Sequence, residues 1–141
     1  MSINENEKLN EMSEFLLREF PQSSVEVVEL SDMACKVKQR VDERHLRPGG
    51  TVSGPTMFAV ADCAIYVAIL NEIGFVALAV TTNLNINFLR KPAANKDIIG
   101  ECKIMKMGKS LVVADVFLYS EGMEEPVAHA VGTYSIPPRR N

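Results

Sequence analysis

One segment near the middle of the chain restricts the fold more than any other feature. Residues 55–71 read PTMFAVADCAIYVAILN and place apolar side chains on every side of a helix. Such a helix must be buried all round, because any exposed side would leave apolar surface in water. Pro55 suits the first helical position, and Gly74 follows shortly after the expected end. We therefore expect a central helix that the rest of the chain encloses.

The chain around this segment has one further helical pattern and several strand patterns. Residues 5–20 look helical, because apolar side chains recur at helical spacing from Leu9 to Phe20 and a proline follows. Residues 25–41 predict two short strands or one bent strand. The strands expected after the central helix cover residues 75–82, 83–88, 98–107, 111–119 and 127–136.

This order of elements indicates an α+β fold in which one antiparallel sheet wraps around the apolar helix. No repeat, low-complexity segment or linker interrupts the pattern, so we expect a single domain over residues 1–141. Residues 1–22 would form an N-terminal helical extension of that domain. With 47% hydrophobic residues, the chain has enough apolar material for a core that needs no disulfide or metal.

Composition and charge argue against several classes of function. The formal net charge is −3 and basic blocks are short, so nucleic-acid binding is not expected. The N-terminus is polar and acidic and lacks the pattern of a signal peptide. The longest apolar run, residues 57–70, is too short to span a bilayer and contains Asp62. We expect a soluble, cytoplasmic protein that does not act at a membrane.

The cysteines and histidines do not predict a metal site. Cys35, Cys63 and Cys102 are odd in number and include no CxxC pair, and neither His45 nor His129 has ligand spacing. All three cysteines fit small, buried and reduced hydrophobic residues. We therefore expect no metal and no cofactor.

Asp62 is the chemical anomaly of the central helix. Aspartate is a poor helix former, and an isolated buried carboxylate is costly. None of its neighbours within one helical turn can pair with it. Two interpretations stay open at this point. Asp62 could bond a buried loop amide or hydroxyl and so organise the fold, or it could line a pocket as a nucleophile or general base.

The start of the same helix is a second candidate, because a helix N-terminus presents free N–H groups and a partial positive charge. Gly54 has no side chain, so a substrate could approach its N–H closely and an oxyanion could be held there. Plain N-capping by Ser53 or Gly54 would explain the sequence Ser53-Gly54-Pro55 equally well.

The spacing of Gly54 and Asp62 indicates whether one subunit or two subunits form the active site. Eight residues of helix correspond to a rise of about 12 Å, too far for one substrate carbonyl to touch both residues of one chain. If two such helices lie antiparallel across a two-fold axis, Gly54 of one helix can face Asp62 of the other. The spacing therefore favours sites shared between subunits, two per dimer.

From about residue 41 onward, the sequence resembles the hotdog-fold acyl-CoA thioesterases of the phenylacetate-pathway (PaaI-like) group. Three stretches carry the resemblance: GGTVSGPTMFAVADCAIYVAI, VTTNLNINFLRKP, and KMGKSLVVADVFLYSEG with AHAVGTY. The first is the most specific, since its glycine is followed eight residues later by a helical acid. The resemblance implies a hotdog fold and the hydrolysis of acyl-CoA, or a related acyl thioester, to a free acid and a thiol.

The resemblance also implies roles for individual residues. The Gly54 amide would polarise the thioester carbonyl, and Asp62 of the facing subunit would act as nucleophile or base. Thr81 matches a hydroxyl that lies near the nucleophilic water. Arg90 and Lys91 match the positions that contact the phosphates of coenzyme A. Ser53 and Pro55 flank Gly54 and complete the expected catalytic and substrate-binding set, together with Arg47.

Two positions depart from the family pattern. Many members have His-Gly-Gly where this chain has Ser53-Gly54-Pro55, and an Asn where it has Arg47. Ser53 could still donate a hydrogen bond, and Arg47 could pair with a phosphate or with Asp62. Two rival functions follow: a non-catalytic acyl-CoA or lipid-binding module, and a hotdog dehydratase that would use His45 with Asp62. His129 lies in a strand pattern and fits a structural role.

We expect a homodimer or a homotetramer that binds an acyl thioester. The β-prone residues 75–82 could pair with their two-fold mate into a continuous sheet. Asn83, Asn85 and Asn87 would then face away from the helix, where a second dimer could pack.

Overall fold

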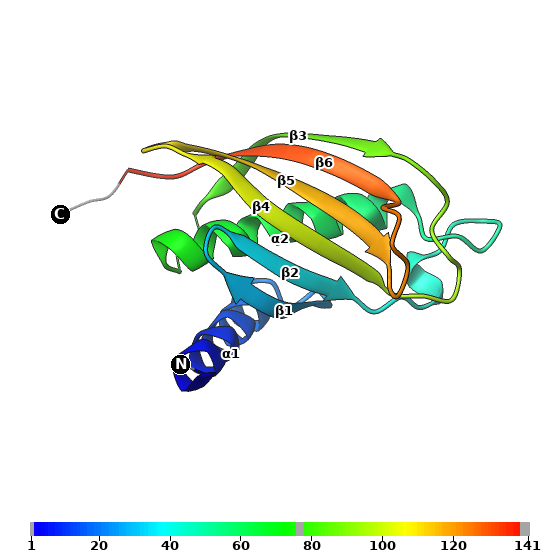
Figure 1. Ribbon diagram of the computed structural model, residues 1–141, viewed down its shortest axis with the longest axis horizontal. Helices are drawn as coiled ribbons and strands as arrows, with labels where there is room; N and C mark the ends of the chain where they lie inside the picture. The colour runs from blue at the N-terminus through cyan, green and yellow to red at the C-terminus, as the bar shows by residue number, and fades with distance from the viewer. Residues whose placement is uncertain (1, 76–77, 139–141) are drawn as a thin grey trace.

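The computed structural model describes residues 2–75 and 78–138 and shows two long helices and one six-stranded antiparallel sheet. The elements are α1 (Ser2–Glu19), β1 (Val25–Ser31), β2 (Ala34–Gln39), a 3-10 helix (Glu43–His45), α2 (Gly54–Ile73), β3 (Val80–Phe88), β4 (Ile98–Met107), β5 (Leu111–Ser120) and β6 (Ala128–Ser135). The strand order is β1-β2-β4-β5-β6-β3. Figure 1 shows α2 running along the inside of the curved sheet, while α1 lies beside β1. The α+β hotdog arrangement expected from the sequence is confirmed.

Helix α2 forms the core because its apolar side chains meet the inner faces of the strands. Val60, Ala64 and Ile65 are completely buried, as are the inward-facing residues at the centre of β5. Gly132 of β6 allows close packing, since a Cβ there would lie 2.6 Å from Cδ1 of Ile65. Ser53, one of the two candidates from the sequence, is the N-cap of α2, and Gly74 is its C-cap.

Helix α2 (Gly54–Ile73) is longer than the apolar run of residues 57–70. We had judged that run too short to span a bilayer. The 20 residues of α2 are long and apolar enough to cross a membrane by length and composition alone. The expectation was wrong because it counted only the uninterrupted run and not the flanking helical residues. Buried residues make up 56% of the apolar window, and the sheet covers them. Length is therefore weak evidence for a membrane span here.

The expectation that α2 is buried all round was also wrong for the single chain. Pro55, Phe58 and Ala59 are exposed, and the Phe58 side chain keeps 41% of its surface accessible. These residues share one face of the helix with Asp62, at helical spacing. The curved sheet encloses the helix from one side only, so this face of the N-terminal half stays uncovered.

The strand expected at residues 75–82 and the strand expected at 83–88 are one strand, β3, which begins at Val80. Phe75 lies outside it and stacks on Phe15 of α1 with ring centroids 5.1 Å apart. Residues 76 and 77 lie outside the described residues. β-propensity predicted a strand for Phe75, but a contact with a distant helix overrides that local preference. In β3, Asn83, Asn85 and Asn87 are exposed while Leu84 and Ile86 pack on the core, as expected.

Helix α1 covers a further part of the core. Met12, Phe15 and Leu16 are buried, which matches the predicted helical spacing. At its C-terminal end, the Phe20 ring meets the Tyr66 ring of α2 edge-on, with centroids 5.3 Å apart. The extension predicted for residues 1–22 therefore supplies part of the core.

Candidate active site

Asp62 is half-buried on α2, and two hydroxyl groups hold one of its carboxylate oxygens. Thr81 Oγ1 donates to Asp62 Oδ1 over 2.7 Å, and the Tyr134 hydroxyl donates to the same oxygen over 2.8 Å. Thr81 and Tyr134 are directly opposite each other in the β3–β6 pair. The partners of this carboxylate thus come from strands far away in sequence and not from its neighbours on the helix. Oδ2 has no hydrogen-bond donor among residues 2–75 and 78–138.

The Tyr134 hydroxyl stays a donor at neutral pH. The side chain is only 3% exposed, and this burial raises the pKa of Tyr134 well above its usual range. The negative charge of Asp62 raises that pKa further, because a second negative charge beside the carboxylate is unfavourable. The sequence did not indicate Tyr134, since a buried aromatic residue in a strand is usually part of the core.

Cys63 lies next to Asp62 and is half-buried, not buried as we expected. Desolvation of the thiol raises its pKa to about 12, and the Asp62 charge contributes to the shift. The thiol is therefore protonated at neutral pH and is not a nucleophile. Asp62 is the acidic group of this site that can act on a substrate.

The start of α2 presents one free amide. The Ser53 hydroxyl accepts a hydrogen bond from Thr56 N over 3.2 Å and donates to Thr56 Oγ1 over 2.9 Å. Met57 N donates to the Ser53 carbonyl, and Pro55 has no N–H. The Gly54 N–H has no acceptor within the described part of the chain. The capping role of Ser53 and the free amide of Gly54 therefore occur together.

Gly54 lies close to the side chain of Phe88, at the end of β3. A Cβ at this position would lie 3.3 Å from Cζ of Phe88, so the Phe88 ring would have to move by a few tenths of an ångström. Glycine therefore leaves more room beside the N–H at the start of α2 than a larger residue would.

A cavity of about 610 Å³ opens beside Asp62. Asp62, Thr81 and Tyr134 line one part of it, and the apolar wall comes from α1, α2 and the segment before β3. The apolar lining includes Leu16, Phe20, Val25, Ala59, Tyr66 and Ala79. A mostly apolar cavity next to a carboxylate suits an acyl chain bound near the group that acts on it.

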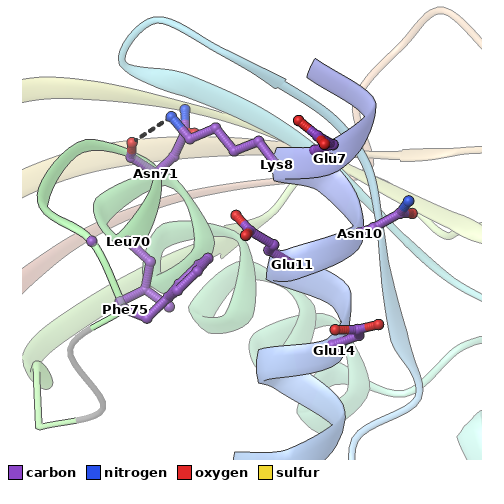
Figure 2. Close-up of a pocket in the computed structure, with 9 residues that line it drawn as sticks. Glu7, Lys8, Asn10, Glu11, Glu14, Leu70, Asn71 and Phe75 are labelled. Atoms are coloured by element: carbon purple, nitrogen blue, oxygen red, sulfur yellow. Dashed lines mark hydrogen bonds between the residues drawn. The ribbon is translucent and has the colours of Figure 1, made fainter. Parts of the chain in front are cut away.

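A second cavity, of about 620 Å³, lies between α1 and the C-terminal end of α2. Figure 2 shows Lys8 reaching from α1 to the Asn71 carbonyl, with Glu7, Glu11 and Glu14 on the same helix. None of the predicted site residues lines this cavity. Its three glutamates would repel the phosphates of coenzyme A, so the cavity beside Asp62 is the better candidate.

Comparisons with known proteins identify the family. A model of the thioesterase superfamily matches residues 49–127, more than half of the chain. The chain belongs to the thioesterase superfamily. A candidate thioesterase from Silicibacter sp. TM1040 has 45% sequence identity, 92% coverage of both chains and a TM-score of 0.85. The expected enzyme class, a thioesterase, is therefore confirmed.

Two more distant structures share the fold of this thioesterase. A mutant of the phenylacetic acid degradation protein PaaI from Thermus thermophilus is 23% identical, with 80% of this chain and 93% of that chain covered and a TM-score of 0.70. A hypothetical thioesterase from Streptococcus pneumoniae, solved with coenzyme A, is 18% identical, with 94% and 99% covered and a TM-score of 0.74. No protein of curated function matches the chain.

The basic residues expected at the thioesterase site lie away from Asp62. Arg47 is exposed on the loop before α2 and does not pair with Asp62, whose hydrogen bonds come from two hydroxyl groups. Arg90 donates to the Pro126 carbonyl, and its Nε is 3.8 Å from Oε1 of Glu125. Lys91 is exposed beside it. None of the three lines the cavity beside Asp62.

The two histidines differ in their relation to the site. His129 lies on the outer face of the sheet, where Nε2 is 3.1 Å from Asp115 Oδ2 and the ring packs on Phe117. This placement agrees with the structural role expected from its strand pattern. His45 instead lines the cavity that contains Asp62, together with Gln39 from the end of β2. Sequence spacing had suggested His45 only as part of a rival dehydratase.

Proposed function

We propose that this thioesterase hydrolyses acyl-CoA at a site shared by two subunits. The observation that carries the proposal is the Asp62 carboxylate, which two hydroxyls hold through Oδ1 at the edge of an apolar cavity. Its free Oδ2 can take a proton from water or attack the substrate. The structure solved with coenzyme A, from Streptococcus pneumoniae, supports the choice of thiol.

The reaction needs a base or nucleophile and a group that stabilises an oxyanion. In the general-base route, Asp62 accepts a proton while water oxygen forms a bond to the acyl carbon. The carbonyl oxygen becomes an oxyanion at the free Gly54 N–H. The C–S bond then breaks, and the proton held by Asp62 passes to the thiolate sulfur, so that a free acid and a thiol are released. In the nucleophilic route, Asp62 itself forms the bond to the acyl carbon, and the C–S bond breaks to release the thiolate. Water then hydrolyses the resulting anhydride, which gives the free acid and restores the Asp62 carboxylate.

The exposed face of α2 supports a site shared between subunits. Gly54 and Asp62 are about 12 Å apart along one helix, so one carbonyl reaches Gly54 of one chain and Asp62 of its partner. Pro55, Phe58 and Ala59 leave apolar surface exposed on the face that carries Asp62. A second α2 packed across a two-fold axis would cover that surface.

The phosphates of coenzyme A would meet Arg90 and Lys91 in this proposal, since both residues are exposed just after β3. Arg90 would exchange its weak contact with Glu125 for a phosphate. Arg47, exposed on the loop before α2, is a further candidate contact for a phosphate.

The test is hydrolysis of an acyl-CoA panel, followed through the released thiol. Asp62→Asn should lower turnover about 100-fold or more while substrate affinity and oligomeric state remain nearly the same, because the base or nucleophile is lost and the side-chain shape is kept. Asp115→Asn is the matched control, since this carboxylate lies on the outer face of the sheet. Full activity in Asp62→Asn would favour the non-catalytic binding module.

A further inference from the structure

We propose that the cavity of this thioesterase selects acyl groups that carry a neutral hydroxyl or amide at their far end, through Gln39 and His45. This inference rests on the proposed function, because it assigns the acyl group of the same site. Gln39 comes from β2, while Thr81 and Tyr134 come from β3 and β6. β4 and β5 separate these strands in the sheet, so the cavity has polar groups on opposite arms of the sheet.

The contacts of Gln39 determine the orientation of its amide. Nε2 donates to the Arg40 carbonyl over 2.8 Å and to Ser24 Oγ over 2.8 Å. A backbone carbonyl only accepts, so the nitrogen must be on that side. Both amide hydrogens are then used, and Oε1 has no donor within residues 2–75 and 78–138. The side chain is 5% exposed and lines the cavity, so Oε1 is an unused acceptor there.

The contacts of His45 determine its tautomer in the same way. Nδ1 accepts a hydrogen bond from the Asp42 backbone N–H over 2.9 Å. A backbone N–H only donates, so Nδ1 carries no proton and Nε2 does. The Asp42 carboxylate, near the same ring, already binds Arg44. The His45 side chain is 14% exposed, and no acceptor for its Nε2 exists in the described part of the chain.

Besides Asp62 Oδ2, the lining therefore holds an unused acceptor on Gln39 and an unused donor on His45, in a cavity that is otherwise mostly apolar. A plain alkyl chain would leave both groups without partners, which is unfavourable for buried polar atoms. A carboxylate would meet Gln39 Oε1 and Asp62, with no cationic side chain in the lining. A hydroxyl or an amide carries both a donor and an acceptor, so it can pair with Oε1, with Nε2–H or with both.

The experiment measures binding of non-hydrolysable thioether analogues by calorimetry. The analogues correspond to ω-hydroxyacyl-CoA, to the alkyl-CoA in which a methyl replaces the hydroxyl, and to ω-carboxyacyl-CoA, in one series of chain lengths. At the length that spans the cavity, the wild type should prefer hydroxyl over methyl about 10-fold or more. The carboxylate analogue should bind more weakly than the hydroxyl analogue.

Matched variants of the two residues separate their roles from a general loss of structure. His45→Asn can keep an acceptor for Asp42 N but has no donor at the position of Nε2, so the hydroxyl preference should fall about 10-fold. His45→Gln places an amide nitrogen there and should restore most of the preference. Gln39→Met should also lower it. Tyr119→Phe is the control that should keep the ratio, because Tyr119 lies at an outer-facing position of β5 and does not line this cavity.

Two outcomes would overturn the inference. One is equal affinity for hydroxyl and methyl analogues at every length in the wild type. The other is an unchanged ratio in both His45→Asn and Gln39→Met, with folding of the variants checked by thermal unfolding. Failure of the proposed function looks different, since the wild type would then bind the thioethers without hydrolysing any acyl-CoA. Absence of binding by every thioether would overturn both.

Discussion

At the scale of single residues, the hydroxyls of Thr81 and Tyr134 position the Asp62 carboxylate. Both donate to Oδ1, which leaves Oδ2 free for the reaction. A hydrogen bond to a charged group contributes about 1.5–3 kcal/mol, so its loss should be visible in turnover. The two residues act through Asp62 and are positioning residues.

Tyr134→Phe should lower kcat by about 10-fold or more, because it removes one donor from the carboxylate. KM should change much less than kcat, because the lost hydrogen bond orients the carboxylate and does not hold the substrate. The measurement is kcat and KM for an acyl-CoA substrate. Tyr119→Phe, at an outer-facing position of β5, should keep the wild-type values. An unchanged kcat in Tyr134→Phe would contradict the positioning role.

At the scale of elements, the close approach of β6 to α2 depends on a glycine. A Cβ at Gly132 would lie 2.6 Å from Ile65 Cδ1 and 3.2 Å from Leu84 Cδ1. Since the core is tightly packed, one added methyl must displace these side chains. This contact also holds β3 and β6 against the helix that carries Asp62.

Gly132→Ala should lower the free energy of unfolding by about 1–3 kcal/mol through overpacking. Ile65→Val removes the Cδ1 atom that clashes and alone should cost about 0.5–1.5 kcal/mol. The double variant should lose less free energy of unfolding than the sum of the losses in the two single variants, because the clash is absent. Urea unfolding of the four proteins gives the coupling. Strict additivity would show that the clash is relieved elsewhere.

At the scale of the whole molecule, the uncovered surfaces predict an oligomer. Within the described residues, β3 is an edge strand that pairs with β6 alone. Exposed apolar side chains occur on β3, directly after it and near the start of α2: Phe58, Val80, Phe88 and Leu89. Light scattering at micromolar concentration should show a dimer or a tetramer. A monomer would contradict both the oligomer and the shared site.

Mixing two inactive variants tests the shared site directly. Gly54→Val should block approach to the helix start, and Asp62→Asn removes the acid. In a heterodimer, one site combines the intact Gly54 of the first chain with the intact Asp62 of the second, while the other site carries both lesions. Reassembled protein should recover activity, at most about half per heterodimer by symmetry. No recovery, with heterodimers confirmed by mass, would contradict a site shared in this way.

Much of the fold was predictable from the sequence because local patterns decided it. The apolar run predicted α2, and Ser53 and Gly74 cap its two ends. Alternation predicted β4, β5 and β6 within one or two residues. The cost of a carboxylate in an apolar helix was enough to single out Asp62. In each case the deciding interaction lies within a few residues of chain.

Only the tertiary structure decided which groups surround that carboxylate. Tyr134 meets Asp62 from 72 residues away, and Thr81 reaches it because β3 pairs with β6. Gln39 and His45 share the cavity with Asp62 because β2 and the following loop pack along α2. The strand expected at Phe75 failed for the same reason, since its ring stacks on α1. Local pattern determined the helices and most strands, whereas contacts between distant segments determined the site.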